Sequence, residues 1–245
     1  MTRKLLLTGA AGKIGSFFHN AYADTYEFLL TDIVEPADVK GAPFAKANLS
    51  DMDAIRPLFD GVDTVVHLGA NPNMDAPWES LLPDNVIATY NVFEAAHQAG
   101  CRRVVYASSI NAVLGYPADR QVHTDMPVYP VNLYGATKCW GEALARYYSH
   151  THGLSSLCLR FGAVQYRDSE MIHWEHEYVD IIQTLEDNAR LIAAAVEAGN
   201  DVMFGNFHGI SNNRYKRLDM TDTNAILDYA PNDDAFEMAR DRGAL

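Results

Sequence analysis

Short, continuously apolar runs alternate along the chain with longer stretches in which apolar residues recur at helical spacing. A run that is apolar on both faces predicts a strand covered on both sides, as in parallel sheets. The apolar runs predict strands at residues 4–8, 28–31, 64–68, 104–107, 156–161 and 202–204. The amphipathic stretches predict helices from the first strand to about residue 23 and at residues 51–59, 80–98, 133–150 and 185–197.

This alternation predicts an α/β fold, a Rossmann-type doubly wound parallel sheet. The regular alternation of strands and helices ends near Phe161, and the residues that follow mix polar, aromatic and histidine side chains. We therefore predict a Rossmann core over residues 1–161 and a small substrate-binding lobe over residues 162–245, partly packed on the core. Ligands of open α/β folds bind at the carboxyl edge of the sheet, where this lobe is expected.

Composition narrows the classes of function. The chain has 245 residues, of which 48% are hydrophobic, enough to bury a full core. With 19 basic and 32 acidic residues the formal charge is −13, which argues against binding to nucleic acid. The first apolar run is too short to span a membrane. The three cysteines lack CxxC spacing and are typical of a reducing compartment, so we expect a soluble cytoplasmic protein.

A glycine-rich turn joins the first predicted strand to the first helix. Its glycines, Gly9, Gly12 and Gly15, follow a GxxGxxG spacing that permits a tight turn, close approach to a diphosphate and close helix packing. Asp32 ends the second strand, where a carboxylate binds the adenine ribose and repels a 2′-phosphate. The glycine turn and Asp32 together predict that the core at residues 1–161 binds NAD rather than NADP. Packing alone could also explain the glycines, and Asp32 could instead be a solvated acid at the end of a strand.

A second group of residues carries candidate chemistry. Tyr134 and Lys138 lie four apart at the start of a predicted helix and so share one face. A neighbouring ammonium lowers the pKa of a phenol, which makes the pair a candidate general base for an alcohol. Ser109 follows the fourth predicted strand and could hold the substrate oxygen. Chance spacing on an amphipathic helix and a turn-capping serine are the plainer alternatives.

Together these features resemble the extended short-chain dehydrogenases/reductases, the NAD-dependent epimerase/dehydratase-like family. The resemblance rests on residues 8–15, Asp32, residues 67–70, Asn85, residues 108–109 and the YxxxK motif. It implies that Ser109, Tyr134 and Lys138 are catalytic. The cofactor-binding residues that it implies are Gly9, Gly12, Lys13, Ile14, Gly15, Asp32, Asn48, Leu49, Leu68, Gly69, Ala70, Asn85, Tyr134 and Lys138.

Within this family the chain looks most like the short uronate and hexose dehydrogenases, which oxidise C1 of a sugar such as a hexuronate to a lactone with NAD. Only 84 residues follow Phe161, too few for a lobe that holds a nucleotide sugar. The resemblance implies substrate contacts from Ser109, Asn111 and Arg167, although Arg167 fits a solvated loop equally well. A sugar epimerase or isomerase with tightly bound NAD, or a non-catalytic dinucleotide sensor, remains the alternative.

Three further features have weaker assignments. His173 and His176 have a metal-like spacing, but we predict no metal site because no further ligand run accompanies them. The polar residues 206–214 predict a loop that either reaches the sugar or serves only as a turn. Aromatic residues on the two long helices either face the sheet or form the four-helix bundle of a homodimer; they are Phe93, Trp140, Tyr147 and Tyr148.

Overall fold

A computed structural model describes residues 2–242. Over these residues the main sheet has seven strands in the order β3-β2-β1-β4-β5-β6-β9, and every neighbouring pair is parallel. This arrangement confirms the predicted Rossmann-type fold. The strands are β1 (Lys4–Thr8), β2 (Glu27–Asp32), β3 (Phe44–Lys46), β4 (Thr64–His67), β5 (Arg103–Ser109), β6 (Ser155–Phe161) and β9 (Phe204–Gly209).

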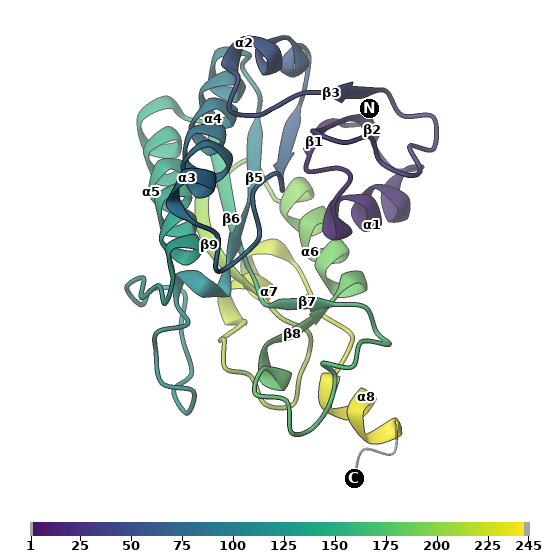
Figure 1. The fold of residues 1–245 in the computed structure, drawn as a ribbon, viewed down its shortest axis with the longest axis vertical. Helices are drawn as coiled ribbons and strands as arrows, with labels where there is room; N and C mark the ends of the chain where they lie inside the picture. The colour runs from purple at the N-terminus through teal and green to yellow at the C-terminus, as the bar shows by residue number, and fades with distance from the viewer. Residues whose placement is uncertain (1, 243–245) are drawn as a thin grey trace.

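Helices cover both faces of this sheet (Figure 1). One face carries α1 (Lys13–Tyr22) and α6 (Leu185–Glu197), which contact each other. The other carries α2 (Met52–Ile55), α4 (Ala88–Gln98) and α5 (Leu133–His152), with the short turns η1 (Arg56–Phe59) and η3 (Ile110–Ala112) nearby. The helix predicted at residues 80–98 consists of α3 (Trp78–Leu81), a π-helical stretch η2 (Leu82–Ile87) and α4. Pro83 lies in that stretch and cannot donate a helical hydrogen bond.

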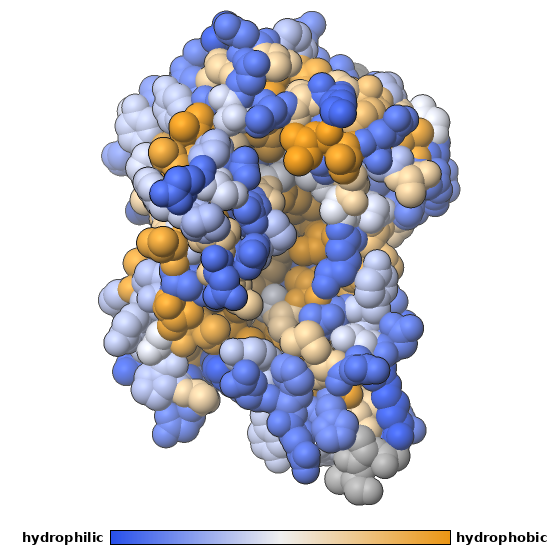
Figure 2. Space-filling model, viewed as in Figure 1, coloured by the Kyte–Doolittle hydropathy of each residue, from blue (hydrophilic) through white to orange (hydrophobic). Residues whose placement is uncertain are grey.

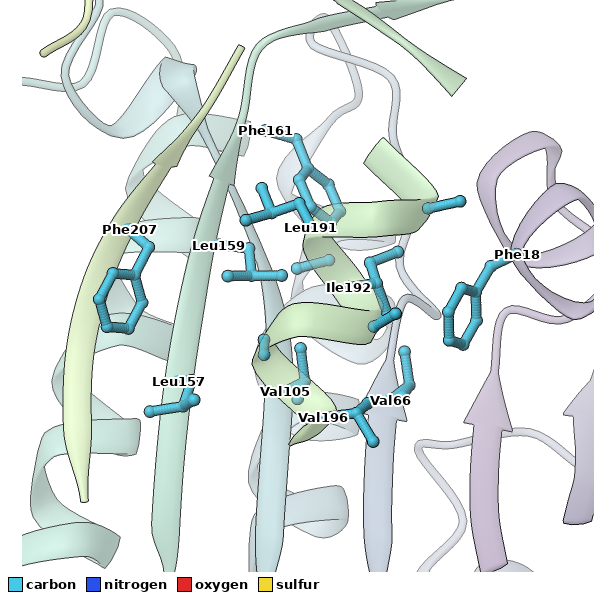
Figure 3. Packing of buried hydrophobic residues seen from close by; sticks show 14 of the residues in the cluster. Phe18, Val66, Val105, Leu157, Leu159, Phe161, Leu191, Ile192, Val196 and Phe207 are labelled. Carbon is cyan, nitrogen blue, oxygen red and sulfur yellow. The ribbon is translucent and has the colours of Figure 1, made fainter. Parts of the chain in front are cut away.

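Alternate residues of each strand enter separate cores on the two faces. On β1, Leu5 and Leu7 belong to the cluster under α1 and α6, while Leu6 belongs to the cluster under α4 and α5. Figure 3 shows the first cluster, in which Leu191 and Ile192 of α6 lie among side chains from the strands. Since both faces are covered, the middle residues of β1, β4 and β5 are apolar on both sides, as the sequence pattern predicted.

The chain after Phe161 departs most from the prediction. It adds a two-stranded parallel sheet of β7 (Ala163–Gln165) and β8 (Ile182–Thr184), with η4 (Val179–Ile181), α7 (Thr221–Leu227) and α8 (Ala235–Asp241). None of these elements, nor β3, was predicted. A small core of its own lies here; its members include Ile172, Val179, Ile182 and Phe236.

The strand predicted at residues 202–204 was placed wrongly, since β9 spans Phe204–Gly209 and includes half of the predicted polar loop. Pairing with β6 overrides the polar sequence there. His208 is fully buried in this strand because Arg160 and the carbonyl of Asp219 contact its ring nitrogens. The described part of the predicted lobe, residues 162–242, therefore completes the main sheet with β9 and its cover with α6.

The aromatic residues of the long helices differ in burial. Phe93 of α4 and Tyr148 of α5 are buried and stack with ring centroids 5.5 Å apart. Trp140 and Tyr147 of α5 are 42% and 50% exposed. Within residues 2–242 no helix has the length and apolarity that crossing a bilayer requires.

Candidate active site

The glycine loop packs the first strand, the first helix and the fourth strand against one another. Gly9 has φ +69°, and a Cβ on it would lie 2.7 Å from the backbone nitrogen of Gly69. A Cβ on Gly15 would overlap the Gly9 carbonyl oxygen. Gly12 is the N-cap of α1, so the amino end of that helix opens beside the loop. These residues form a cradle that fits a dinucleotide diphosphate, since glycine alone leaves the space and the helix dipole favours the negative charge.

Backbone groups hold Asp32 at the mouth of this loop. Its Oδ2 accepts a hydrogen bond from the nitrogen of Ala11 at 2.9 Å, and its Oδ1 accepts one from Ile33 at 2.7 Å. The carboxylate thus sits at the carboxyl end of β2, where an adenine ribose would lie. Lys13 donates to the Val164 carbonyl at 2.6 Å, and partial burial lowers the pKa of its ammonium.

One cleft of about 1000 Å³ runs from this loop along the carboxyl edge of the sheet. Figure 2 shows a hollow in this face of the molecule with hydrophobic residues inside it. Most of the predicted site residues line the cleft: Gly9, Gly12, Lys13, Ile14, Gly15, Asp32, Asn48, Leu49, Leu68, Gly69, Ala70, Ser109, Asn111, Tyr134 and Lys138.

The start of α5 brings Tyr134 to the end of β5. Asn132 caps the helix, its Oδ1 accepting from the nitrogen of Gly135 at 2.7 Å, and its Nδ2 donates to Asn111 at 3.0 Å. A Cβ on Gly135 would overlap the carbonyl oxygen of Asn111, so this glycine lets the helix approach the turn that follows Ser109. Local contacts therefore place the phenol beside the serine.

The other two candidate catalytic residues are held by hydrogen bonds. Lys138 is buried, its Nζ donates to the carbonyl of Ala107 at 2.9 Å, and it lies 5.4 Å from the ring centre of Tyr134. Burial lowers the pKa of Lys138 to about 8. Ser109 Oγ accepts from the backbone nitrogen of Asn111 at 3.1 Å and from its Nδ2 at 3.2 Å. Both bonds use the oxygen as acceptor, so the O–H group can still donate.

The pKa of Tyr134 shifts in the direction opposite to the one predicted from Lys138. Burial raises the pKa of the phenol, and the neighbouring Ser109 hydroxyl offsets this only in part. In the protein alone the phenol is therefore protonated at neutral pH. A base role requires an additional positive charge in the cleft.

Sequence reasoning missed a buried network behind these residues. Glu142 accepts from Arg160 through two hydrogen bonds of 2.8 Å, and from Ser108 Oγ at 2.6 Å. Arg160 and Glu142 are 1% and 4% exposed. Glu142 lies one further turn along the face of α5 that carries Tyr134 and Lys138, and this i, i+4, i+8 spacing was a signal that could have found it.

Two predicted site residues do not line the cleft. Asn85 is buried, and its side chain accepts from the nitrogen of Asn71 at 2.8 Å and donates to Thr137 at 3.2 Å, so it ties a cleft loop to α5. Arg167 is half exposed, and its guanidinium makes a bidentate pair with Asp233 at 2.8 and 3.0 Å. A substrate contact from Arg167 thus stays a prediction that this geometry does not support.

Two histidines considered for metal binding accept hydrogen bonds in turns. His173 Nδ1 accepts from the backbone nitrogen of Glu175 at 3.3 Å, and His176 Nδ1 accepts from that of Tyr178 at 3.1 Å. Over residues 2–242, no cluster of three or more histidine, cysteine or acidic side chains has the geometry of a metal site.

Comparison with known proteins places this site in a family. The sequence profile of the NAD dependent epimerase/dehydratase family matches residues 5–165. An NAD-dependent glucose-6-phosphate dehydrogenase from Haloferax volcanii is 30% identical over 97% of this chain and 96% of its own length. An L-arabinose 1-dehydrogenase (NAD(P)(+)) from the same organism is 32% identical over 95% and 97%.

Solved structures also match the fold of this chain. A mutant uronate dehydrogenase from Agrobacterium tumefaciens, complexed with NAD, superposes with a TM-score of 0.88 and 29% identity over 98% of this chain and 89% of its own. The profile match covers well over half of the chain, and it includes the glycine loop and the Tyr134–Lys138 pair. The chain therefore belongs to the NAD-dependent epimerase/dehydratase family.

Proposed function

We propose that this protein is an NAD-dependent dehydrogenase that oxidises the C1 hydroxyl of a small cyclic sugar to a lactone. One observation carries the proposal: Ser109, Tyr134 and Lys138 meet in the same cleft as the glycine loop and Asp32. A hydroxyl bound beside Ser109 would therefore lie next to a site that fits a dinucleotide.

The chain's own groups can carry the proton. The Ser109 O–H donates to the substrate oxygen, and the Tyr134 phenolate accepts the proton that the C1 hydroxyl loses. Lys138, fixed on the Ala107 carbonyl, keeps a positive charge near the phenol. Bound oxidised NAD would supply the hydride acceptor and the extra positive charge that lowers the pKa of Tyr134.

The relatives support sugar oxidation. The substrates in the names of these relatives are glucose 6-phosphate, L-arabinose and uronates, so they share a cyclic sugar and differ in its charge. An epimerase with tightly held NAD would use the same residues but release no NADH. A dinucleotide sensor would have no use for Tyr134 and Lys138 facing a cleft.

The decisive test is NADH formation from neutral sugars, uronates and sugar phosphates, followed by the absorbance of the reduced nicotinamide. Tyr134→Phe should lower kcat by at least about a hundredfold while NAD affinity stays within about twofold. Tyr147→Phe, on the exposed face of the same helix, is the matched control. Substantial turnover by Tyr134→Phe would reject this base, and silence with bound NAD would favour the epimerase or the sensor.

We also propose a homodimer in the cytoplasm. Exposed apolar side chains on the outer face of the α4–α5 layer support the dimer; they are Ile87, Tyr90, Trp140 and Tyr147. Its bundle would pair these helices across a two-fold axis. The cysteines are all free, which is usual in a reducing compartment. Light scattering of Trp140→Glu would test the dimer.

A further inference from the structure

The far wall of the cleft, beyond Ser109, is made by residues that carry no positive charge. Asn111 and Leu114 follow β5, and the chain after β6 supplies Gln165, Met171, Tyr178 and Ile181. We call these six residues the far wall. Amide and phenol groups are interleaved with apolar side chains, which suits the hydroxyls and C–H faces of a sugar ring.

The arginines from β6 up to α7 are all paired with acids elsewhere, and Arg120, six residues after Leu114, lies over the ring of Tyr116 and does not line the cleft. Within the described chain, each of the five arginines from Arg160 to Arg217 has a carboxylate partner. The pairs are Arg160–Glu142, Arg167–Asp233, Arg190–Asp187, Arg214–Asp234 and Arg217–Asp180. None of these arginines lines the cleft.

The cationic side chains that line the cleft are hydrogen-bonded to backbone carbonyls. Among residues 2–242 they are Lys13, bound to the Val164 carbonyl beside the glycine loop, and Lys138, bound to the Ala107 carbonyl under Tyr134. The cleft also contains the carboxylate of Asp84, which faces the Ser80 hydroxyl at 3.4 Å. The far wall beyond Ser109 therefore carries no charged side chain.

We infer that the substrate is a neutral aldose, one whose C5 substituent is hydrogen, methyl or hydroxymethyl rather than carboxylate or phosphomethyl. The inference rests on the proposed function and specifies its substrate class. An anionic substituent that enters the far wall would lose its hydration without gaining a cationic partner, and an uncharged one would not. The apolar members Leu114, Met171 and Ile181 favour the uncharged substituent further.

Sugars matched in ring stereochemistry test this directly. D-Xylose, D-glucose, D-glucuronate and D-glucose 6-phosphate form one series; L-arabinose, D-galactose and D-galacturonate form a second. We expect kcat/KM with NAD to be at least about tenfold higher for the neutral members of whichever series is oxidised. A uronate or phosphate that matches its neutral counterpart would overturn the inference and leave the dehydrogenase standing. Oxidation of no sugar in either series would overturn the proposed function, and the inference with it.

A charge placed in the far wall tests the inference independently. Met171→Arg should raise the ratio of kcat/KM for the anionic sugar to that for the neutral sugar by about tenfold, because the guanidinium supplies the missing partner. Met171→Gln is the matched control, since it also removes the thioether contact with Gln165 but adds no charge. Tyr178→Arg repeats the test from a second position if Met171→Arg does not fold. An unchanged ratio in a folded arginine variant would overturn the inference.

Discussion

The cofactor region and the far wall lie in one cleft but are built in different ways. The cofactor region, Gly9–Asp32 with the ends of β4 and β5, consists of strand ends and turns that are neighbours in the sheet. Four residues of the far wall lie in the segment between β6 and α6, and contacts distant in sequence hold this segment: Arg167 pairs with Asp233, 66 residues on, and Thr184 donates to the same acid across 49 residues. Turns and neighbouring strand ends therefore position the cofactor region, and contacts between distant segments hold much of the far wall.

The strongest test of this contrast is to cut the chain at the predicted boundary. A fragment of residues 1–161 contains the whole glycine loop but lacks α6, which covers one face of the sheet, and β9, which pairs with β6. We expect it not to fold, because Val66, Val105 and Leu159 would lose their cover. Circular dichroism melting of the fragment and of the full chain measures this. A cooperative transition in the fragment would show that the core stands alone.

The same contrast explains what the sequence could predict. Gly15 and Asp32 were found because a strand–turn–helix needs glycine at the crossing and leaves an acid at the next strand end, both local requirements. β9 was misplaced because its polar residues are buried only through partners such as Arg160, which lies 48 residues away from His208. The pairing of Arg167 with Asp233 could not be predicted, because Asp233 lies in a tail without periodicity.

The buried pair Glu142–Arg160 connects α5 with β6 and, through His208, with β9. Replacing Glu142 by Leu leaves a buried, unpaired guanidinium. We expect the free energy of unfolding to fall by about 3–5 kcal/mol, measured by urea denaturation.

Two controls isolate this effect. Glu142→Leu combined with Arg160→Met removes both charges and should recover most of the loss. Glu237→Leu breaks the exposed pair with Arg214, 3.3 Å long, and should cost less than about 1 kcal/mol. If the single and double variants at the buried pair were equally unstable, the cost would come from packing rather than charge.

Two buried histidines are neutral, His67 at the end of β4 and His208 in β9. Burial lowers the pKa of His67 to about 3 and that of His208 to about 4, from 6.5. Both folded-state values lie below the unfolded value, so the unfolded chain takes up the protons and stability is lost as pH falls below 6.5. Between pH 6.5 and 5 we expect each histidine to cost about 2 kcal/mol, measured by urea denaturation across that range.

Single replacements separate the two histidines. His67 contacts Thr8 Oγ1 at 2.8 Å in the cofactor region, and His208 contacts the Asp219 carbonyl at 2.9 Å beyond it. His67→Asn and His208→Asn should each be less stable at neutral pH and should each remove about half of the pH dependence. A variant that keeps the full dependence would show that its histidine is already protonated or that another group titrates.

The smallest expected effect tests a single carboxylate in the cofactor region. Asp32→Ala removes the group that would bind the adenine ribose and repel a 2′-phosphate, so the ratio of kcat/KM with NADP to that with NAD should rise about tenfold to a hundredfold. That change corresponds to about 1.4–2.8 kcal/mol. Glu35→Ala, at an exposed acid three residues further on, is the control for charge alone and should leave the ratio unchanged. If both variants kept the ratio, Asp32 would serve only to hold the turn through Ala11 and Ile33. Cofactor choice would then depend on contacts between distant segments, as the far wall does.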